Sequence, residues 1–395
     1  MTAAVEENEI YSFPMQRLNP SSLRFHLTRL LAQGTEKKVF AGATAAIVTG
    51  SDGNRHQVIA GAGVTRLDGK GVAVVPKTIF DLASLTKPLA TALGILLLVD
   101  RGHLHLNDRL ADLCPLPVPP TKKEITVAQL LSHSSGLPPY KEYFRNFPPD
   151  TDNTHHLALL AAILDAPLAY PTGRDCRYSD LGFILLGEIL ERISGISLDA
   201  FFLQNISRPL HIENELFFRR RKANGAMETD MEKITKFAAT ENCPWRQRTL
   251  QGEVHDEHCH LLGGAAGHAG LFGTAAAVSK LCAAILDGVQ GRTTALPLSR
   301  TVLKKALSPQ YPGHTWCLGF DTPSLTGYTS AGNLLSRRSV GHLGFTGTSF
   351  WIDPAEEITI VLLSNRIHPS RENKKIRDFR PWFHDQVLSF IINGK

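Results

Sequence analysis

Residues 80–87 read FDLASLTK and open a long apolar segment that ends before Gly102. This pattern predicts a helix that begins near Ser84. Ser84 and Lys87 form the only Ser-x-x-Lys spacing in the sequence, and side chains three residues apart on a helix share one face. A serine hydroxyl becomes an effective nucleophile when a neighbour takes its proton, and a partly desolvated lysine can do so. Taken alone, the spacing is also explained by a capping serine beside a surface lysine.

Outward from this segment, β-rich runs lie near both ends of the chain and a helical block separates them. Strand character is found in residues 43–49, 56–63, 349–354 and 358–364. The turn residues 51–54 predict a hairpin between the first two runs. A last helix is predicted over 378–392, and Thr126, Thr274 and Gly195 mark the ends of internal helices. The pattern predicts one mixed α/β unit assembled from both termini and interrupted by a helical region.

Length and composition exclude several classes of protein. The 395 residues are 43% hydrophobic and 20% charged, which is ordinary globular composition and argues against disorder. The net charge of +5 comes from 42 basic and 37 acidic residues, so we expect neither a nucleic-acid nor a membrane partner. The most apolar run, residues 90–99, is too short to span a bilayer. The N-terminal stretch has no apolar core typical of a signal peptide, and Cys-x-x-Cys is absent. We therefore expect a reduced, cytoplasmic protein.

Two further motifs follow the Ser-x-x-Lys pair. Residues 176–180 read CRYSD and open a predicted helix, and residues 341–348 read GHLGFTGT and lead into a strand. In this order, the three motifs resemble those of the penicillin-recognising serine hydrolases, most closely the class C β-lactamase and related esterase branch. The stretches 130–137 (LLSHSSGL) and 267–274 (GHAGLFGT) also fit. The resemblance spans roughly residues 21–392.

The resemblance implies a fold and an organisation of the chain. The fold is α/β (α+β), with an antiparallel sheet flanked by helices and a largely helical second region. The chain would be a single unit over 1–395, with an α/β part in 20–105 plus 336–395 and the largely helical region in 106–335.

The resemblance also implies roles for individual residues. Ser84 would be the acylated nucleophile, and Lys87 the neighbour that lowers its pKa. Tyr178 would be the general base and the acid towards the leaving group. His342 would lie on the substrate-facing strand. The backbone N–H groups of Ser84 and Phe345 would form the oxyanion hole.

The binding side of the expected site comprises Asp180, His342, Gly344 and Phe345. Two of these residues depart from the family pattern. Asp180 stands where asparagine is usual, so an amide donor is replaced by a carboxylate. His342 stands where lysine is common, so a permanent cation is lost. Both departures argue against β-lactams as preferred substrates, and both leave the acyl-enzyme groups in place.

A histidine-rich run offers an alternative candidate site in this sequence, one that could bind a metal. Residues 255–260 read HDEHCH, and His268 follows. These residue types can bind zinc, but HExxH and paired CxxC are absent. We expect a polar active-site loop here, with no metal and no cofactor. The basic tail 371–380 is expected to be a solvated face.

These observations predict a serine hydrolase that forms an acyl-enzyme at Ser84 and hydrolyses an ester or an amide. The substrate would be a small-molecule ester, amide or peptide-like compound, so the candidates are a carboxylesterase and a peptide or muropeptide amide hydrolase. The alternative is a weakly active or inactive penicillin-binding or sensor-type module. Loss of Ser84, Lys87 or Tyr178 would have favoured it, and all three are present.

Overall fold

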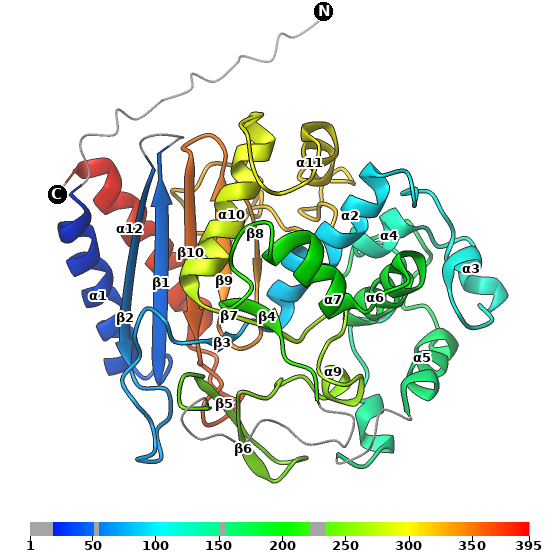
Figure 1. Ribbon diagram of the computed structural model, residues 1–395, viewed down its shortest axis with the longest axis horizontal. Coiled ribbons are helices and arrows are strands. Elements are labelled where there is room, and N and C mark those ends of the chain that lie inside the picture. The colour runs from blue at the N-terminus through cyan, green and yellow to red at the C-terminus, as the bar shows by residue number, and fades with distance from the viewer. Residues whose placement is uncertain (1–18, 51–54, 150–154, 222–233, 395) are drawn as a thin grey trace, which may run out of the picture.

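The computed structural model describes residues 19–50, 55–149, 155–221 and 234–394. Its main sheet has five antiparallel strands in the order β2-β1-β10-β9-β8 (Figure 1). The strands are β1 (Gly42–Thr49), β2 (His56–Gly63), β8 (Val340–Leu343), β9 (Ser349–Asp353) and β10 (Ile358–Ser364). β1 pairs with β10, so strands from the two ends of the chain lie side by side. The structure confirms the predicted antiparallel sheet flanked by helices.

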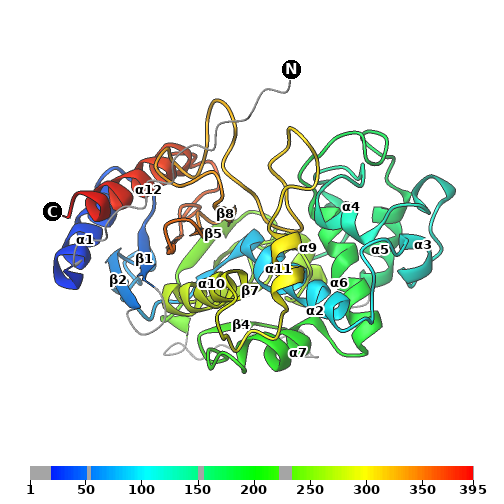
Figure 2. The ribbon, with the colours of Figure 1, turned by 90° about the horizontal axis from the view of Figure 1, so that it is seen from above.

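Helices cover both faces of this sheet. α1 (Pro20–Glu36) and α12 (Ile376–Asn393) lie on one face, and α10 (Ala275–Gln290) lies on the other (Figures 1 and 2). Successive side chains of a strand point to opposite faces. On β10, Ile360 and Leu362 therefore join the apolar core beneath α1 and α12, whereas Val361 and Leu363 join the core that includes α10. Every residue of β10 is buried for this reason.

The second region is largely helical and lies beyond α10 (Figure 2). Its helices are α2 (Leu93–Asp100), α3 (Leu110–Leu113), α4 (Val127–Leu131), α5 (His156–Asp165), α6 (Asp180–Ser194), α7 (Leu198–Phe202), α9 (Glu257–Leu261) and α11 (Arg300–Ala306). This differs from the expected range 106–335, because α2 precedes that range and α10, which lies within it, packs on the main sheet. The predicted ends are confirmed, because Thr126 and Thr274 cap α4 and α10 with their side chains. Gly195 ends α6 in the left-handed conformation, at φ 71°.

Short strands in this region were not predicted. β3 (Phe80–Asp81) and β4 (Leu216–Phe218) both pair with β7 (Leu271–Gly273). β5 (Ala239–Cys243) pairs with β6 (Arg248–Gln251). Strands of two to five residues have almost no period in the sequence, so alternation could not reveal them. The pairing of β3 with β7 holds the start of the Ser84 segment beside the loop that precedes β7.

The segment that carries Ser84 is less regular than the predicted helix. It begins as a 3-10 turn at Ala83–Leu85, continues as a π-helix at Lys87–Ala92 and becomes α-helical in α2. Taken together, Ala83–Asp100 is long and apolar enough to cross a membrane, by length and composition only, so the apolar stretch is longer than residues 90–99. Buried residues make up 83% of it, and its leucines belong to the largest apolar core.

Candidate active site

Ser84 follows a sharp turn between β3 and the central helical segment. Ala83 has φ 48°, which is rare for a residue with a side chain. The Asp81 carboxylate stabilises the turn, because its Oδ1 accepts a 2.8 Å hydrogen bond from the Ala83 N–H. The other oxygen, Oδ2, accepts from the His255 N–H at 2.7 Å. Strained backbone of this kind clusters at functional sites, and here it brings Ser84 to the wall of a large cavity.

The structure brings together the three residues that the sequence singled out for catalysis. The Nζ of Lys87 lies 3.0 Å from the Oγ of Ser84, and the Tyr178 hydroxyl donates to the same oxygen at 2.7 Å. Tyr178 directly precedes Ser179, the N-cap of α6. One oxygen therefore contacts two groups that can accept or donate a proton, as nucleophilic catalysis by serine requires.

Lys87 is fully buried and has two further oxygen partners. Its Nζ donates to the backbone carbonyl of His268 at 3.0 Å and lies 2.6 Å from the Oδ1 of Asp180. Burial lowers the pKa of Lys87, because the charged form loses hydration, while the charge of Asp180 opposes this effect. The contact with Asp180 was not predicted, and it makes this carboxylate part of the environment of the lysine.

Tyr178 is a neutral phenol in this environment. Burial raises its pKa well above the ordinary value, and the nearby charge of Asp180 adds to the effect. The ring lies against His133 and Trp316, with ring centroids 4.8 Å and 5.6 Å away. Packing on these rings restrains the ring of Tyr178, whose hydroxyl reaches Ser84.

His133 supports the segment that carries Tyr178, a role that sequence reasoning missed. Its Nδ1 accepts a hydrogen bond from the Ser179 N–H at 3.1 Å, and its backbone carbonyl accepts from the Arg177 N–H at 2.9 Å. His133 is 1% exposed, and burial lowers its pKa well below the ordinary value, so the ring is neutral. The sequence singles out the stretch 130–137, which contains His133, as part of the family resemblance. Such a pattern does not show which residues of another segment His133 contacts.

His342 lies on the edge strand β8 and lines the same cavity as Tyr178, with the two ring centroids 6.0 Å apart. The ring is 2% exposed, and its Nδ1 lies 2.8 Å from the carbonyl oxygen of Leu343, to which it donates. Burial, together with the charge of Lys87, lowers the pKa of His342 to about 3. The residue that replaces the common lysine is therefore uncharged.

Gly344 and Phe345 form the turn after β8, and both line the cavity. A Cβ on Gly344 would lie 2.6 Å from the backbone oxygen of Leu82, so only glycine permits this approach. The side chains of Thr346 and Thr348 stabilise the position of the turn, because their hydroxyls donate to the backbone oxygens of Asp81 and Leu82. The turn is thereby held against the Ser84 segment.

The cavity has a volume of about 1000 Å³ and contains every residue of the expected binding side. Part of its wall comes from the basic tail, through Arg371, Lys374, Arg377 and Arg380, and from Arg366, which follows β10. The expectation of a solvated face holds for Lys374, Lys375 and Arg377, which are exposed, but not for Arg380, which is buried. Arg380 is 6% exposed and donates to the carbonyls of Gly344 and Thr348, because α12 packs directly beneath the turn.

The histidine-rich run is partly helical, which corrects the expectation of a loop. Glu257–Leu261 form α9, and the side chain of Asp256 caps this helix. His255 contacts Glu241 at 2.9 Å, and His260 contacts Glu253 at 3.2 Å. Asp256 lines the same cavity as Ser84. The run therefore contributes to the wall of the site, as expected for residues beside the cleft.

Comparison with known proteins shows the family of this chain. The family model described as Beta-lactamase matches residues 27–380, so the chain belongs to the beta-lactamase family. A putative D-alanyl-D-alanine carboxypeptidase of Escherichia coli is 32% identical over 308 residues, which cover 74% of this chain and 70% of that protein. An N-acetylmuramyl-L-alanine amidase of Bacillus subtilis is 31% identical over 317 residues, covering 74% and 69%. Family and relatives indicate a hydrolase of the serine β-lactamase and penicillin-binding-protein type.

Solved structures show the same fold. The octameric penicillin-binding protein homologue from Pyrococcus abyssi has a TM-score of 0.68 at 21% identity, covering 96% of this chain and 78% of that one. EstCE1, a hydrolase with promiscuous acyltransferase activity, has a TM-score of 0.66 at 20% identity, covering 92% and 99%. The predicted family and fold class are both confirmed.

Proposed function

We propose that this protein is a serine amide hydrolase that acts on peptide-like substrates through an acyl-enzyme at Ser84. One observation carries the proposal: the Ser84 oxygen lies 3.0 Å from the Lys87 amine and 2.7 Å from the Tyr178 hydroxyl, at the wall of a cavity of about 1000 Å³. Two relatives more than 30% identical are named as a putative D-alanyl-D-alanine carboxypeptidase and an N-acetylmuramyl-L-alanine amidase, and both names refer to the cleavage of an amide bond. These names favour an amide over an ester as the natural substrate.

In the first step, the neutral amine of Lys87 accepts the proton of the Ser84 hydroxyl while Oγ attacks the substrate carbonyl. Burial favours the neutral amine. Tyr178 retains its proton, since its pKa is raised, and it donates that proton to the leaving nitrogen. The resemblance implied that Tyr178 is the general base, whereas the charge environment supports Lys87 in this role. In the second step, the deprotonated Tyr178 oxygen accepts a proton from the water that attacks the Ser84 ester, and Lys87 returns its proton to the Ser84 oxygen as the acid leaves.

The negative charge of the tetrahedral intermediate would be stabilised by the N–H groups of Ser84 and Phe345. Among the described residues, the Phe345 N–H donates no hydrogen bond, and both residues line the cavity. A donor of this kind contributes roughly 3 kcal/mol to the transition state.

The test combines labelling with a panel of substrates. A fluorophosphonate probe should label Ser84, as peptide mapping would show. The panel contains a D-alanyl-D-alanine peptide, a muropeptide with an N-acetylmuramyl-L-alanine bond, a p-nitrophenyl ester and a chromogenic cephalosporin. We expect one of the two amides to have the highest kcat/KM.

The matched control is Lys87→Met, which removes the amine and keeps an unbranched apolar chain. It should abolish labelling while the folded protein persists. Labelling without turnover of any compound would support the sensor-type module instead. Best turnover of the p-nitrophenyl ester would support a carboxylesterase. Labelling at another serine would contradict the assignment of Ser84.

A further inference from the structure

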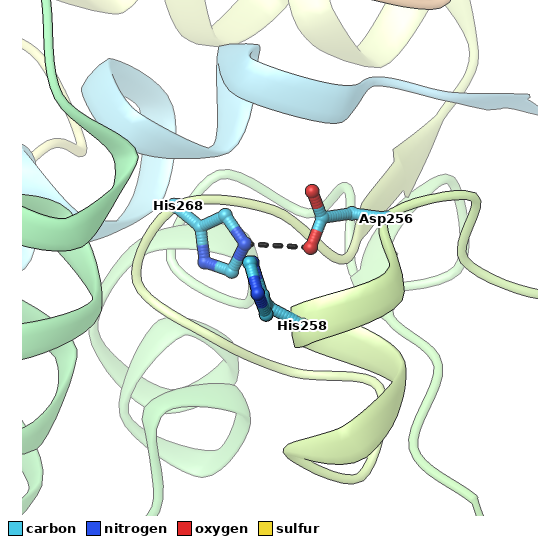
Figure 3. A group of neighbouring side chains, drawn as sticks. All are labelled: Asp256, His258 and His268. Atoms are coloured by element: carbon cyan, nitrogen blue, oxygen red, sulfur yellow. Dashed lines mark hydrogen bonds and ion pairs between the residues drawn. The ribbon is translucent and has the colours of Figure 1, made fainter. Parts of the chain in front are cut away.

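Three potential metal ligands meet beside the cavity, where Asp256 forms part of the wall and the His268 carbonyl contacts Lys87. Asp256 precedes α9, His258 lies in α9, and His268 lies in the loop before β7. One ligand atom from each side chain lies within 4.8 Å of the other two. Figure 3 shows the two imidazole rings and the carboxylate gathered around a common point, with the His268 Nε2 2.7 Å from the Asp256 Oδ1.

The ring of His258 makes no hydrogen bond within the part of the chain that the structure describes, although it is completely buried. Its residue exposure is 0%, and among the described residues neither ring nitrogen has a hydrogen-bond partner. The Nδ1 of His268 is also buried and unpaired. Burial of unpaired polar groups costs free energy, so a buried imidazole normally donates, accepts or binds an ion. A bound ion would supply the missing partner for a nitrogen of His258.

Neighbouring histidines of the same run do not share this property. His255 is paired with Glu241, and His260 is paired with Glu253. Among the described histidines of residues 255–268, the buried nitrogens without a hydrogen bond belong to His258 and His268, which lie beside Asp256. If these histidines served only to pack the wall, we would expect each of them to have a hydrogen-bond partner. Instead, His255 and His260 are paired, whereas His258 is not.

We propose that Asp256, His258 and His268 bind a divalent transition-metal ion of the Zn²⁺ type. Two imidazole nitrogens and one carboxylate oxygen are preferred zinc ligands. In tetrahedral geometry, with bonds of about 2.0–2.2 Å, ligand atoms lie roughly 3.3 Å apart. The three side chains would therefore close by about 1.5 Å at most, and the Asp256–His268 hydrogen bond would be replaced by two bonds to the ion.

The proposed ion would lie beside the cavity and close to Lys87. Asp256 and Ala269 line the cavity, and the carbonyl of His268 accepts from the Lys87 amine. Three protein ligands leave a fourth position for water or for a substrate group, as in zinc sites that are open to a cleft. The inference does not rest on the proposed function, because the ion takes none of the roles of Ser84, Lys87 and Tyr178.

Metal binding can be measured without any substrate. The full-length protein is stripped with a chelator, dialysed against Zn²⁺ and analysed for bound metal. We expect about one Zn²⁺ per chain and a higher melting temperature with Zn²⁺ than without it. Co²⁺ in place of Zn²⁺ should give visible absorption bands of a site with nitrogen ligands.

His258→Asn and Asp256→Asn should each lower the bound metal at least tenfold. His260→Asn is the matched control, because it changes another histidine of α9 whose partner is Glu253, and it should retain the metal. The proposal is overturned if the wild type binds no Zn²⁺ above the dialysis background, or if folded His258→Asn binds as much as the wild type. The variants are replaced by measurements on the wild type if they do not fold. The proposal is then overturned when Zn²⁺ does not raise the melting temperature of the wild type and Co²⁺ gives no visible absorption bands.

Discussion

The Oδ1 of Asp180 lies 2.6 Å from the Nζ of Lys87, and this ion pair is the main interaction that opposes the effect of burial on the lysine. Burial lowers the pKa of Lys87, and the carboxylate raises it. Removing the carboxylate charge should therefore lower this pKa further. If the neutral amine takes the proton of Ser84, activity rises as pH increases through the pKa of Lys87.

For Asp180→Asn, we accordingly expect the acidic limb of the pH profile of kcat/KM to move to lower pH. The measurement is ester turnover across pH for the variant and the wild type. Asp175→Asn is the control, because this carboxylate pairs with Arg177 in the same loop and should leave the limb in place. A limb that stays where it is, or that moves to higher pH, contradicts the role of Lys87 as the base.

Ser84→Ala should abolish turnover and leave the fold intact. The hydroxyl is the only group of this side chain that can be acylated, and its loss removes no apolar contact. We expect less than about a hundredth of the wild-type ester turnover, an unchanged unfolding midpoint and no fluorophosphonate labelling. Ser21→Ala, a change in the first turn of α1, should retain both ester turnover and fluorophosphonate labelling. Residual turnover above that level would show that another group acts as nucleophile.

β-Lactams should be poor substrates compared with peptide-like amides and esters. His342 is buried, its pKa is about 3, and it therefore offers no cation to a lactam carboxylate at neutral pH. Asp180 offers an acceptor where an amide would donate. Each change costs about 1–3 kcal/mol with a substrate that leaves a polar group unpaired, which together amounts to roughly 30-fold or more in kcat/KM. The comparison is a chromogenic cephalosporin against a short-chain p-nitrophenyl ester.

Asp180→Asn should move this ratio towards the cephalosporin, because it restores the amide donor. A wild type that prefers the cephalosporin would show that the two replaced residues do not set specificity. An unmoved ratio in Asp180→Asn would lead to the same conclusion.

His133→Phe should destabilise the protein and slow catalysis. The Ser179 N–H would lose its acceptor in a buried environment, at a cost of about 1–3 kcal/mol, and the segment that carries Tyr178 would be less restrained. Denaturant unfolding and kcat measure the two effects. His133→Asn offers a side-chain acceptor and tolerates φ 57° at this position, so its losses should be smaller. Equal stability of the phenylalanine variant and the wild type would contradict this role.

Chelation should not prevent acylation of Ser84. In the proposed mechanism, Ser84, Lys87 and Tyr178 provide the nucleophile and both proton-transfer groups, so the fluorophosphonate reaction should need no ion at the Asp256 site. Labelling after dialysis against a strong chelator should remain within about twofold of the untreated rate. Loss of labelling that Zn²⁺ restores would show instead that the ion takes part in the reaction at Ser84.

The sequence predicted features that depend on a few neighbouring residues. Thr126 and Thr274 mark the starts of their helices because a side-chain oxygen accepts from an amide three residues ahead. The long runs 43–49 and 358–364 have enough apolar residues to be identified as strands. The three motifs identified the family and brought Ser84, Lys87 and Tyr178 into one hypothesis. Each of these signals is local, or is a pattern that many chains share.

Only the tertiary structure decided how distant segments meet. The Asp180–Lys87 pair, the support of the Tyr178 segment by His133 and the approach of Arg380 to the Gly344 turn join residues far apart in the chain. In the histidine-rich run, the sequence showed six potential ligands in a row without separating paired from unpaired side chains. Burial made that separation, because it removed water from every ring and left partners to only some of them.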